Sequence, residues 1–313
     1  MSFKPKMRVL LHIGLHKTGT SSIQHVCAKN NVKLRKAGFF WPDDDVIPNI
    51  GTQHSAIPWK FRIDHDTIAV REFFDNAILL AEKYHCHTIL ISGEEFSRLN
   101  DNEMSIFRAV LPSVEYEVFI VFRNIKQYLI SMFKKEIELG RISFSFDHFL
   151  KSINMVQPDD VLNRWEYYFG KEHVHISLFE AFLPNLIENF FRWIGLDPEL
   201  EFSEIHENRS LDIITAFLLS GLLGDQTEEF LLKSREIFDD IYSTKQYKTE
   251  LDDIVAEALS IRFSPRVNHP RLAPFRAVIL DKDLQENNFD ALDYAMRLNR
   301  YLAKLFRLLH KSA

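Results

Sequence analysis

The sequence predicts an α/β fold of three layers, in which helices cover both faces of a central, mostly parallel sheet. Two observations support this prediction. Short apolar runs alternate along the chain with longer segments whose apolar residues recur at helical spacing, a pattern typical of parallel strands joined by helices. After about residue 200 the strand-like runs stop and helix-like segments follow one another, which predicts a helical C-terminal cap.

Each predicted strand is a short apolar run that is followed by a loop or by a helix-like segment. The strands cover residues 7–13, 88–92, 116–122 and 173–178. The helices before residue 200 cover residues 21–37, 67–85, 101–111, 125–140, 147–153, 158–169 and 184–193. Residues 39–66 contain three prolines and an acidic triplet, so we expect that segment to be irregular.

The chain of 313 residues is expected to have two parts. Residues 1–200 would form the α/β core, and residues 201–313 would form a helical subdomain packed on it. Four helix-like segments occur in the second part, at residues 211–223, 227–241, 250–261 and 289–309. The boundary between the parts is weakly marked, because no linker rich in glycine, proline or serine separates them.

The composition is that of an ordinary globular protein, with 46% hydrophobic and 26% charged residues. It excludes a disordered, collagen-like or coiled-coil chain. No run approaches the roughly 18 apolar residues that a membrane span needs, and the apolar stretch near the N-terminus is too short for a signal peptide. Together with only two cysteines, Cys27 and Cys86, these features predict a cytoplasmic protein without a disulfide framework.

The net charge of −6 argues against a broad nucleic-acid surface. However, the first 42 residues contain eight lysines and arginines and no acidic residue. A basic sector in an acidic protein indicates a small anionic ligand at that place. A chance distribution, balanced by acidic helices elsewhere, is the alternative.

The segment HIGLHKTGTSSIQ, residues 12–24, has the features of a phosphate-binding loop between a strand and a helix. Gly14 and Gly19 allow a tight turn, and Lys17 supplies a positive charge. Four hydroxyl side chains accompany them: Thr18, Thr20, Ser21 and Ser22. A Walker A loop would have its lysine directly after the second glycine, whereas Lys17 precedes Gly19. The alternative is an ordinary turn with a capping hydroxyl.

The run HKTGTSSIQ resembles the 5′-phosphosulfate loop of sulfotransferases that use 3′-phosphoadenosine 5′-phosphosulfate (PAPS), and the longer stretch is similar to bacterial members. The resemblance implies a P-loop-type fold and transfer of a sulfuryl group to a hydroxyl acceptor, which could be a carbohydrate. It also implies adenosine 3′,5′-bisphosphate as a product and no metal requirement. Lys17 and its neighbours would bind PAPS. Beside Lys17, His16 would donate a second hydrogen bond to the bridging oxygen of PAPS.

The same family binds the donor's 3′-phosphate with an arginine at the end of a later strand and a serine in the next helix. The segment VFRNIKQYLISMF offers Arg123 and Ser131 at the family spacing. Arg209, in the segment IHENRSLD, would belong to a loop that closes over the nucleotide, although helix capping by Ser210 is the alternative there.

Sulfuryl transfer needs a base near the acceptor hydroxyl. The strand at residues 88–92 ends in SGEEF, and carbohydrate sulfotransferases of the heparan type use a glutamate. The resemblance therefore makes Glu94 the first candidate base and Glu95 the second, while Lys17 would stabilise charge on the bridging oxygen. The alternative is that one glutamate caps the following segment.

Several weaker features remain. The arginines of residues 262–276 could contact an anionic acceptor or lie in a solvated loop, and His54 could line the acceptor cleft. His85, Cys86 and His87 would diverge on a strand, so we expect no metal site there. A metabolite kinase and a non-catalytic nucleotide-binding protein are the alternative functions. The expected partner is a small-molecule or glycan acceptor, and no pattern indicates an oligomeric state.

Overall fold

The computed structural model describes residues 6–43, 54–138, 156–196 and 266–280. The chain divides into two compact units that interleave along the sequence. The first unit consists of residues 1–123, 156–208 and 267–275, and the second of residues 124–155, 209–266 and 276–313. The predicted boundary at residue 200 and the helices predicted at 147–153 and from 211 to 309 lie outside the described residues, so they stay predictions.

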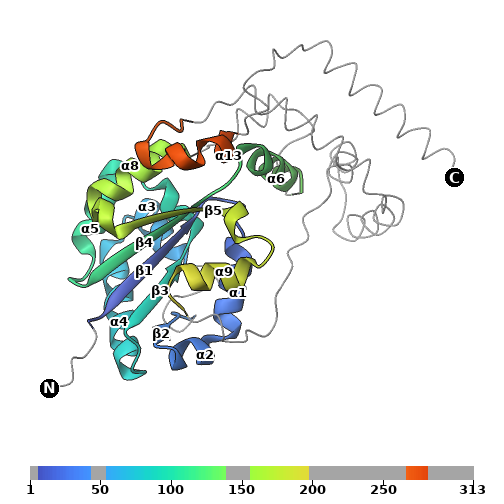
Figure 1. Cartoon of the computed structure of the whole chain (residues 1–313). Coiled ribbons are helices and arrows are strands. Elements are labelled where there is room, and N and C mark those ends of the chain that lie inside the picture. Colours follow the sequence, from blue (N-terminus) through green and yellow to red (C-terminus); the bar gives the residue numbers. More distant parts are fainter. Residues whose placement is uncertain (1–5, 44–53, 139–155, 197–265, 281–313) are drawn as a thin grey trace, which may run out of the picture. The chain divides into compact units, whose positions relative to one another are not determined.

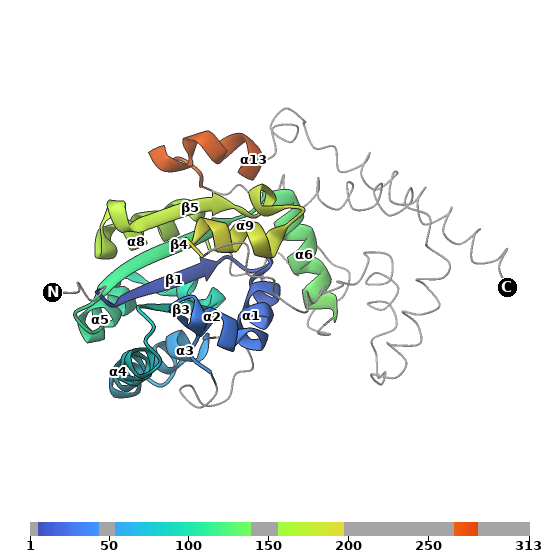
Figure 2. The same cartoon turned by 60° about the horizontal axis from the view of Figure 1, so that its bottom comes forward.

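A five-stranded, all-parallel sheet forms the centre of the first unit, with strand order β2-β3-β1-β4-β5 (Figures 1 and 2). The strands are β1 (Arg8–Gly14), β2 (Phe39–Phe40), β3 (Thr88–Ser92), β4 (Glu115–Phe122) and β5 (Val174–Leu178). In register, Arg8 lies opposite both Thr88 and Glu115. The predicted α/β class and parallel sheet are confirmed, and the four predicted strands are β1, β3, β4 and β5.

Helices cover both faces of this sheet, which gives the predicted three layers. One face is covered by α1 (Thr20–Lys29) and α9 (Leu186–Trp193). The opposite face is covered by α4 (Thr67–Lys83), α5 (Asp101–Val110) and α8 (Pro158–Phe169). In Figure 1 these two groups lie on either side of the strands. Because the helices cover both faces, the loops at the carboxyl ends of the strands are the place where a site can form.

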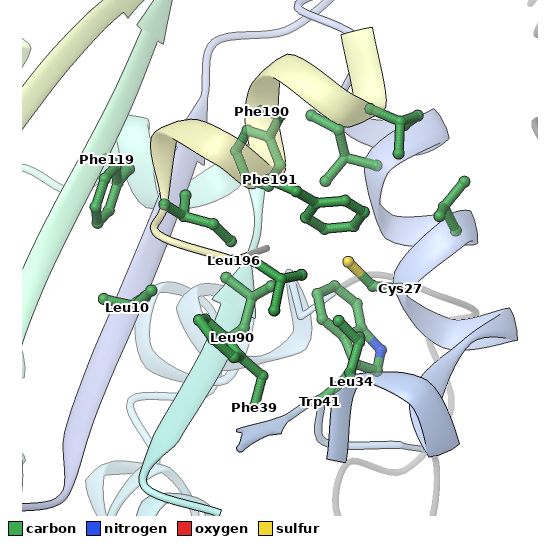
Figure 3. Packing of buried hydrophobic residues seen from close by; sticks show 14 of the residues in the cluster. Leu10, Cys27, Leu34, Phe39, Trp41, Leu90, Phe119, Phe190, Phe191 and Leu196 are labelled. Carbon is green, nitrogen blue, oxygen red and sulfur yellow. The ribbon is translucent and has the colours of Figure 1, made fainter. Parts of the chain in front are cut away.

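Figure 3 shows the core between the sheet and the helices α1 and α9. Leu10, Leu90 and Phe119 rise from three neighbouring strands and meet Phe190 and Phe191 of α9, all of them buried. Burying a side chain of this size stabilises the fold by about 1.5–3 kcal/mol. Because α9 is fixed in this way, the segment before it is held near the loop after β1, where Phe179 lies close to Gly19 and Arg123.

Two segments differ from the sequence prediction. The helix predicted over residues 21–37 is interrupted at Asn30, so that α1 is followed by a separate α2 (Asn31–Lys36). The side-chain amide of Asn30 donates to the Val26 carbonyl at 2.9 Å, which is the competition with the backbone that asparagine offers inside helices. Residues 39–66, expected to be irregular, contain β2 and α3 (Ala56–Arg62). Pro58 lies in the first turn of α3, where proline is tolerated.

Side-chain hydrogen bonds hold residues 267–271 against the sheet and its helices in the first unit. The buried carboxylate of Asp159 accepts hydrogen bonds from the Asn268 amide at 2.8 Å and the His269 amide at 3.0 Å. The Arg271 guanidinium donates to Glu166 and to the Val174 carbonyl, both at 2.6 Å. Arg271, considered above for acceptor binding, is thus engaged in holding the chain. Arg262 lies outside the described residues.

Of the second unit, the structure describes α6 (Ile125–Glu138) and α13 (Arg276–Leu280), which are in contact. The side-chain amide of Asn124 donates to the Val278 carbonyl at 2.7 Å. This bond ties the residue before α6 to α13.

Two buried histidines contact Ser92 at the end of β3. The Ser92 amide donates to His54 Nδ1 at 2.9 Å, so Nε2 carries the proton that His54 donates to the Pro42 carbonyl. His12 Nδ1 lies 2.9 Å from the Ser92 hydroxyl. Burial lowers the pKa of His12 to about 3 and that of His54 to about 4. His54 is therefore a neutral core residue, with both ring nitrogens bonded.

These histidines should make the protein sensitive to acid. The unfolded chain binds their protons near pH 6.5 and the folded chain does not, so the free energy of unfolding falls as the pH drops below 6.5. Between pH 7 and pH 5 each histidine should contribute about 2 kcal/mol to this loss, which urea unfolding at several pH values would measure. His12→Asn and His54→Asn should each flatten the dependence. Slopes equal to that of the natural chain would contradict this assignment.

Candidate functional site

The loop between β1 and α1 lies at the carboxyl end of the parallel sheet. It leaves β1 after Gly14, and the Leu15 amide donates to the Val121 carbonyl of β4 at 3.2 Å. Lys17 and Gly19 both have left-handed backbone conformations, with φ of 69° and 75°. This conformation costs a residue with a side chain about 1–2 kcal/mol. The strain at Lys17 is the kind of outlier that is concentrated at functional sites.

Buried hydroxyl groups support the loop from beneath. Thr18 and Thr20 are almost completely buried, and their hydroxyl oxygens lie 3.2 Å apart. Thr18 also donates to the Leu15 carbonyl at 2.7 Å. A Cβ added to Gly14 would lie 2.2 Å from the Thr20 oxygen, so only glycine fits there. These two hydroxyls therefore help to shape the loop, and their contact with a ligand stays a prediction.

The first turn of α1 has features that suit an anion. Gly19 precedes the helix and forms no side-chain cap, and the turn contains no acidic residue. Ser21 and Ser22 lie in it and are half-buried. Backbone N–H groups at a helix start, together with the helix dipole, favour a bound phosphate.

Arg123 follows the last residue of β4 and contacts the loop. Its Nη1 donates to the Lys17 carbonyl, and its guanidinium lies 4.7 Å from the centre of the Phe179 ring, a cation–π distance. Its Nε is buried and makes no hydrogen bond to any described residue. Burial lowers the pKa of Arg123 below its ordinary value, while the nearby Glu180 opposes this shift.

Two further residues predicted to bind the nucleotide, Ser131 and Arg209, lie where the described structure does not test their role. Ser131 lies on α6, half-buried, in the second unit. Its pairing with Arg123 therefore stays a prediction. Arg209 lies outside the described residues.

Glu94 and Glu95 begin a short 3₁₀ helix, Glu94–Arg98, which follows β3 after the single extended residue Gly93. Glu94 Oε2 lies 2.5 Å from His16 Nδ1 in the loop after β1. Because β3 and β1 are neighbours in the sheet, the ends of the two strands bring these side chains together. Both side chains are largely buried, with exposed fractions of 16% for Glu94 and 20% for His16.

Two arginine side chains contact the carboxylate of Glu95, whereas no arginine among the described residues contacts that of Glu94. Glu95 Oε2 accepts a hydrogen bond from Arg62 Nη1 at 3.0 Å, and its Oε1 lies 3.8 Å from Arg98 Nε. Within the described residues, the hydrogen bond from His16 is the only one to the carboxylate of Glu94. The two adjacent carboxylates, which are equivalent by sequence, therefore have different electrostatic partners.

Sequence reasoning missed Arg62 and Arg98 as part of this cluster, and it assigned His16 to the donor side alone. Arg62 lies at the end of α3, in the segment that was expected to be irregular. The signal for His16 was its place after β1, beside the strand that leads to Glu94. That signal needs the order of the strands, which the motifs do not give.

Hydrogen bonds from Gln24 of α1 to Ser92 of β3 connect two of the elements that carry this site. The Gln24 amide donates to the Ser92 hydroxyl at 3.1 Å and to its carbonyl at 3.3 Å. His12 contacts the same hydroxyl. These bonds fix the end of β3 relative to the helix that follows the loop.

In the part of the chain that the structure describes, no cluster of three or more histidine, cysteine or acidic side chains could hold a metal ion. Cys86 is buried, whereas His85 is exposed. Among the same residues, every helix is too short or too polar to cross a membrane.

No protein-family model matches the sequence, and no curated protein matches it. The solved structures that match this chain include two sulfotransferases. A sulfotransferase from Alicyclobacillus acidocaldarius aligns over 71% of this chain and 97% of its own, with 14% identity and a TM-score of 0.41. The sulfotransferase domain from the curacin biosynthetic pathway aligns over 77% of this chain and 98% of its own, with 9% identity and a TM-score of 0.34.

Proposed function

We propose that this chain is a PAPS-dependent sulfotransferase that moves a sulfuryl group to a hydroxyl acceptor, with a carbohydrate as the favoured acceptor class. One observation carries the proposal. Three adjacent strands each lead to a charged residue: β1 to Lys17, β4 to Arg123 and β3 to Glu94. A cationic loop, a second cation and a carboxylate therefore lie close together at the carboxyl ends of these strands.

The cationic groups would bind the two phosphates of the donor. The start of α1, with Lys17, Ser21 and Ser22, would hold the 5′-phosphosulfate. Arg123 would leave the Lys17 carbonyl and form a forked contact with the 3′-phosphate, together with Ser131. Arg209 would belong to the covering loop.

The reaction would be an in-line displacement at sulfur. The acceptor oxygen bonds to the sulfur, and the bond between sulfur and the bridging oxygen of the 5′-phosphate breaks. The electron pair of that bond stays on the phosphate, where Lys17 stabilises the charge. Glu94 takes the acceptor's proton, and adenosine 3′,5′-bisphosphate is the other product.

Glu94 suits the role of base better than Glu95. Arg62 occupies Oε2 of Glu95, and Arg98 lies close to Oε1. Glu94 Oε1 accepts no hydrogen bond from any described residue, so that oxygen can face an acceptor. The support for this choice is the arrangement of charge around the two carboxylates.

Calorimetry with adenosine 3′,5′-bisphosphate, in the absence of Mg²⁺, tests the donor site. We expect binding that Mg²⁺ does not change. Adenosine 5′-monophosphate, the matched control without the 3′-phosphate, should bind about 10- to 150-fold more weakly, because charge-assisted hydrogen bonds are worth about 1.5–3 kcal/mol.

Two outcomes would favour the other functions. Binding of ATP that requires Mg²⁺, without binding of the bisphosphate, would indicate a kinase and contradict the proposal. Tight bisphosphate binding without transfer of ³⁵S from labelled PAPS to phenol, aliphatic alcohol or sugar acceptors would indicate a non-catalytic binding protein.

A further inference from the structure

The imidazole of His16 lies between the carboxylates of Glu94 and Glu95. Its Nδ1 is 2.5 Å from Glu94 Oε2, and its Nε2 is 3.5 Å from Glu95 Oε1. We infer that His16 is a positioning residue that orients the carboxylate of Glu94 towards the acceptor, and that it does not contact the donor. This inference rests on the proposed function, and it replaces the expectation that His16 binds the phosphosulfate.

The first argument is that the ring is held on both sides. Arg62 and Arg98 fix Glu95, and Glu95 in turn lies beside Nε2 of His16. Nε2 is buried and makes no hydrogen bond to any described residue. To reach a phosphate, the ring would have to give up its short bond to Glu94 and turn away from two carboxylates.

The second argument is the rigidity of the backbone that bears His16. The residue before it is held through both of its backbone polar groups: the Leu15 amide donates to the Val121 carbonyl, and the Leu15 carbonyl accepts a hydrogen bond from the Thr18 hydroxyl. A ring on a backbone fixed in this way can hold a carboxylate in one orientation. Holding catalytic groups in such a productive orientation is worth large factors in rate.

The third argument concerns charge. The sulfuryl and phosphate oxygens of the donor are anionic, and Glu94 and Glu95 border both nitrogens of His16. These carboxylates would repel an anionic donor placed against His16, whereas they would not repel a neutral hydroxyl acceptor. The geometry therefore places His16 on the acceptor side of the loop, next to Lys17 on the donor side.

Two matched substitutions test this role. An asparagine amide reaches the position of Nδ1, and a glutamine amide reaches that of Nε2. His16→Asn should keep kcat for ³⁵S transfer within about fivefold, whereas His16→Gln should lose about 10- to 100-fold. In both variants the KM for PAPS and the calorimetric Kd for adenosine 3′,5′-bisphosphate should stay within about twofold. A weakened KM or Kd in both variants, or full kcat in His16→Gln, would overturn the inference.

A spectroscopic measurement tests the contact itself without catalysis. In protein with ¹⁵N-labelled histidine, the ring N–H signal of His16, assigned by its loss in His16→Gln, should shift strongly in Glu94→Gln. It should change much less in Glu95→Gln, because Glu95 makes no hydrogen bond to the ring. The reverse pattern would contradict the inference.

The failures of the two proposals are distinguishable. If the natural chain does not bind the bisphosphate, the proposed function and this role for His16 both fall. If the natural chain binds it and transfers sulfate while His16→Gln does so at the full rate, the role of His16 alone is wrong.

Discussion

Replacing Glu94 by glutamine is expected to slow sulfuryl transfer by about 10²- to 10⁴-fold, the usual contribution of a positioned base. The amide keeps the shape of the side chain but cannot take the acceptor's proton. Since Glu94 does not bind the donor in the proposed mechanism, the Kd for adenosine 3′,5′-bisphosphate should stay within about twofold. Initial rates with ³⁵S-labelled PAPS, together with calorimetry, measure the two quantities separately.

Glu95→Gln is the matched comparison, because it makes the same chemical change one residue away. It should lower the rate far less than Glu94→Gln. It should instead lower the free energy of unfolding by about 1–3 kcal/mol, because the largely buried Arg62 loses a charged partner. An equal loss of rate in the two variants, or a full rate in Glu94→Gln, would show that the base is assigned wrongly.

Lys17→Gly is expected to affect binding and stability in opposite ways. Loss of the ammonium group should weaken binding of adenosine 3′,5′-bisphosphate by about 10- to 100-fold, since it removes a charge-assisted contact to phosphate. Glycine also relieves the left-handed strain at this position, about 1–2 kcal/mol, against an entropic cost of about 0.5–1 kcal/mol. The free energy of unfolding should therefore be unchanged or up to about 1.5 kcal/mol higher. Calorimetry and urea unfolding check the two expectations.

Two further variants separate charge from backbone strain. Lys17→Ala should lose the same affinity as Lys17→Gly without gaining stability, because alanine keeps a Cβ in the left-handed conformation. Lys17→Arg should keep more affinity than either, since the charge remains. Bisphosphate binding by Lys17→Gly as tight as that of the natural chain would remove Lys17 from the donor site.

Local patterns were sufficient to predict most of the first unit. The runs at residues 88–92 and 158–169 have the predicted bounds, because β3 has three apolar residues in a row between Thr88 and Ser92 and α8 begins with a proline. The loop after β1 also lies where the glycines and lysine indicated. These features depend on neighbouring residues, which the sequence shows directly.

Features that depend on which partner a side chain contacts could not be predicted in the same way. The different surroundings of Glu94 and Glu95 arise because α3 brings Arg62 to the end of β3. The break at Asn30 accompanies a hydrogen bond from its side-chain amide to the Val26 carbonyl, a partner that the sequence alone does not identify. The sequence also did not show that the hydroxyls of Thr18 and Thr20 lie 3.2 Å apart and pack against Gly14, whereas their contact with a ligand stays a prediction.

The bonds from Asp159 and Arg271 have a consequence for the covalent chain. They hold residues 267–271 against α8 and β5 through side-chain hydrogen bonds between residues far apart in the sequence. A nick or a pair of new termini introduced between residues 197 and 265 would thus leave this stretch docked. The first unit could then be reassembled from two separate polypeptides, and its fold would not depend on an unbroken backbone at that point.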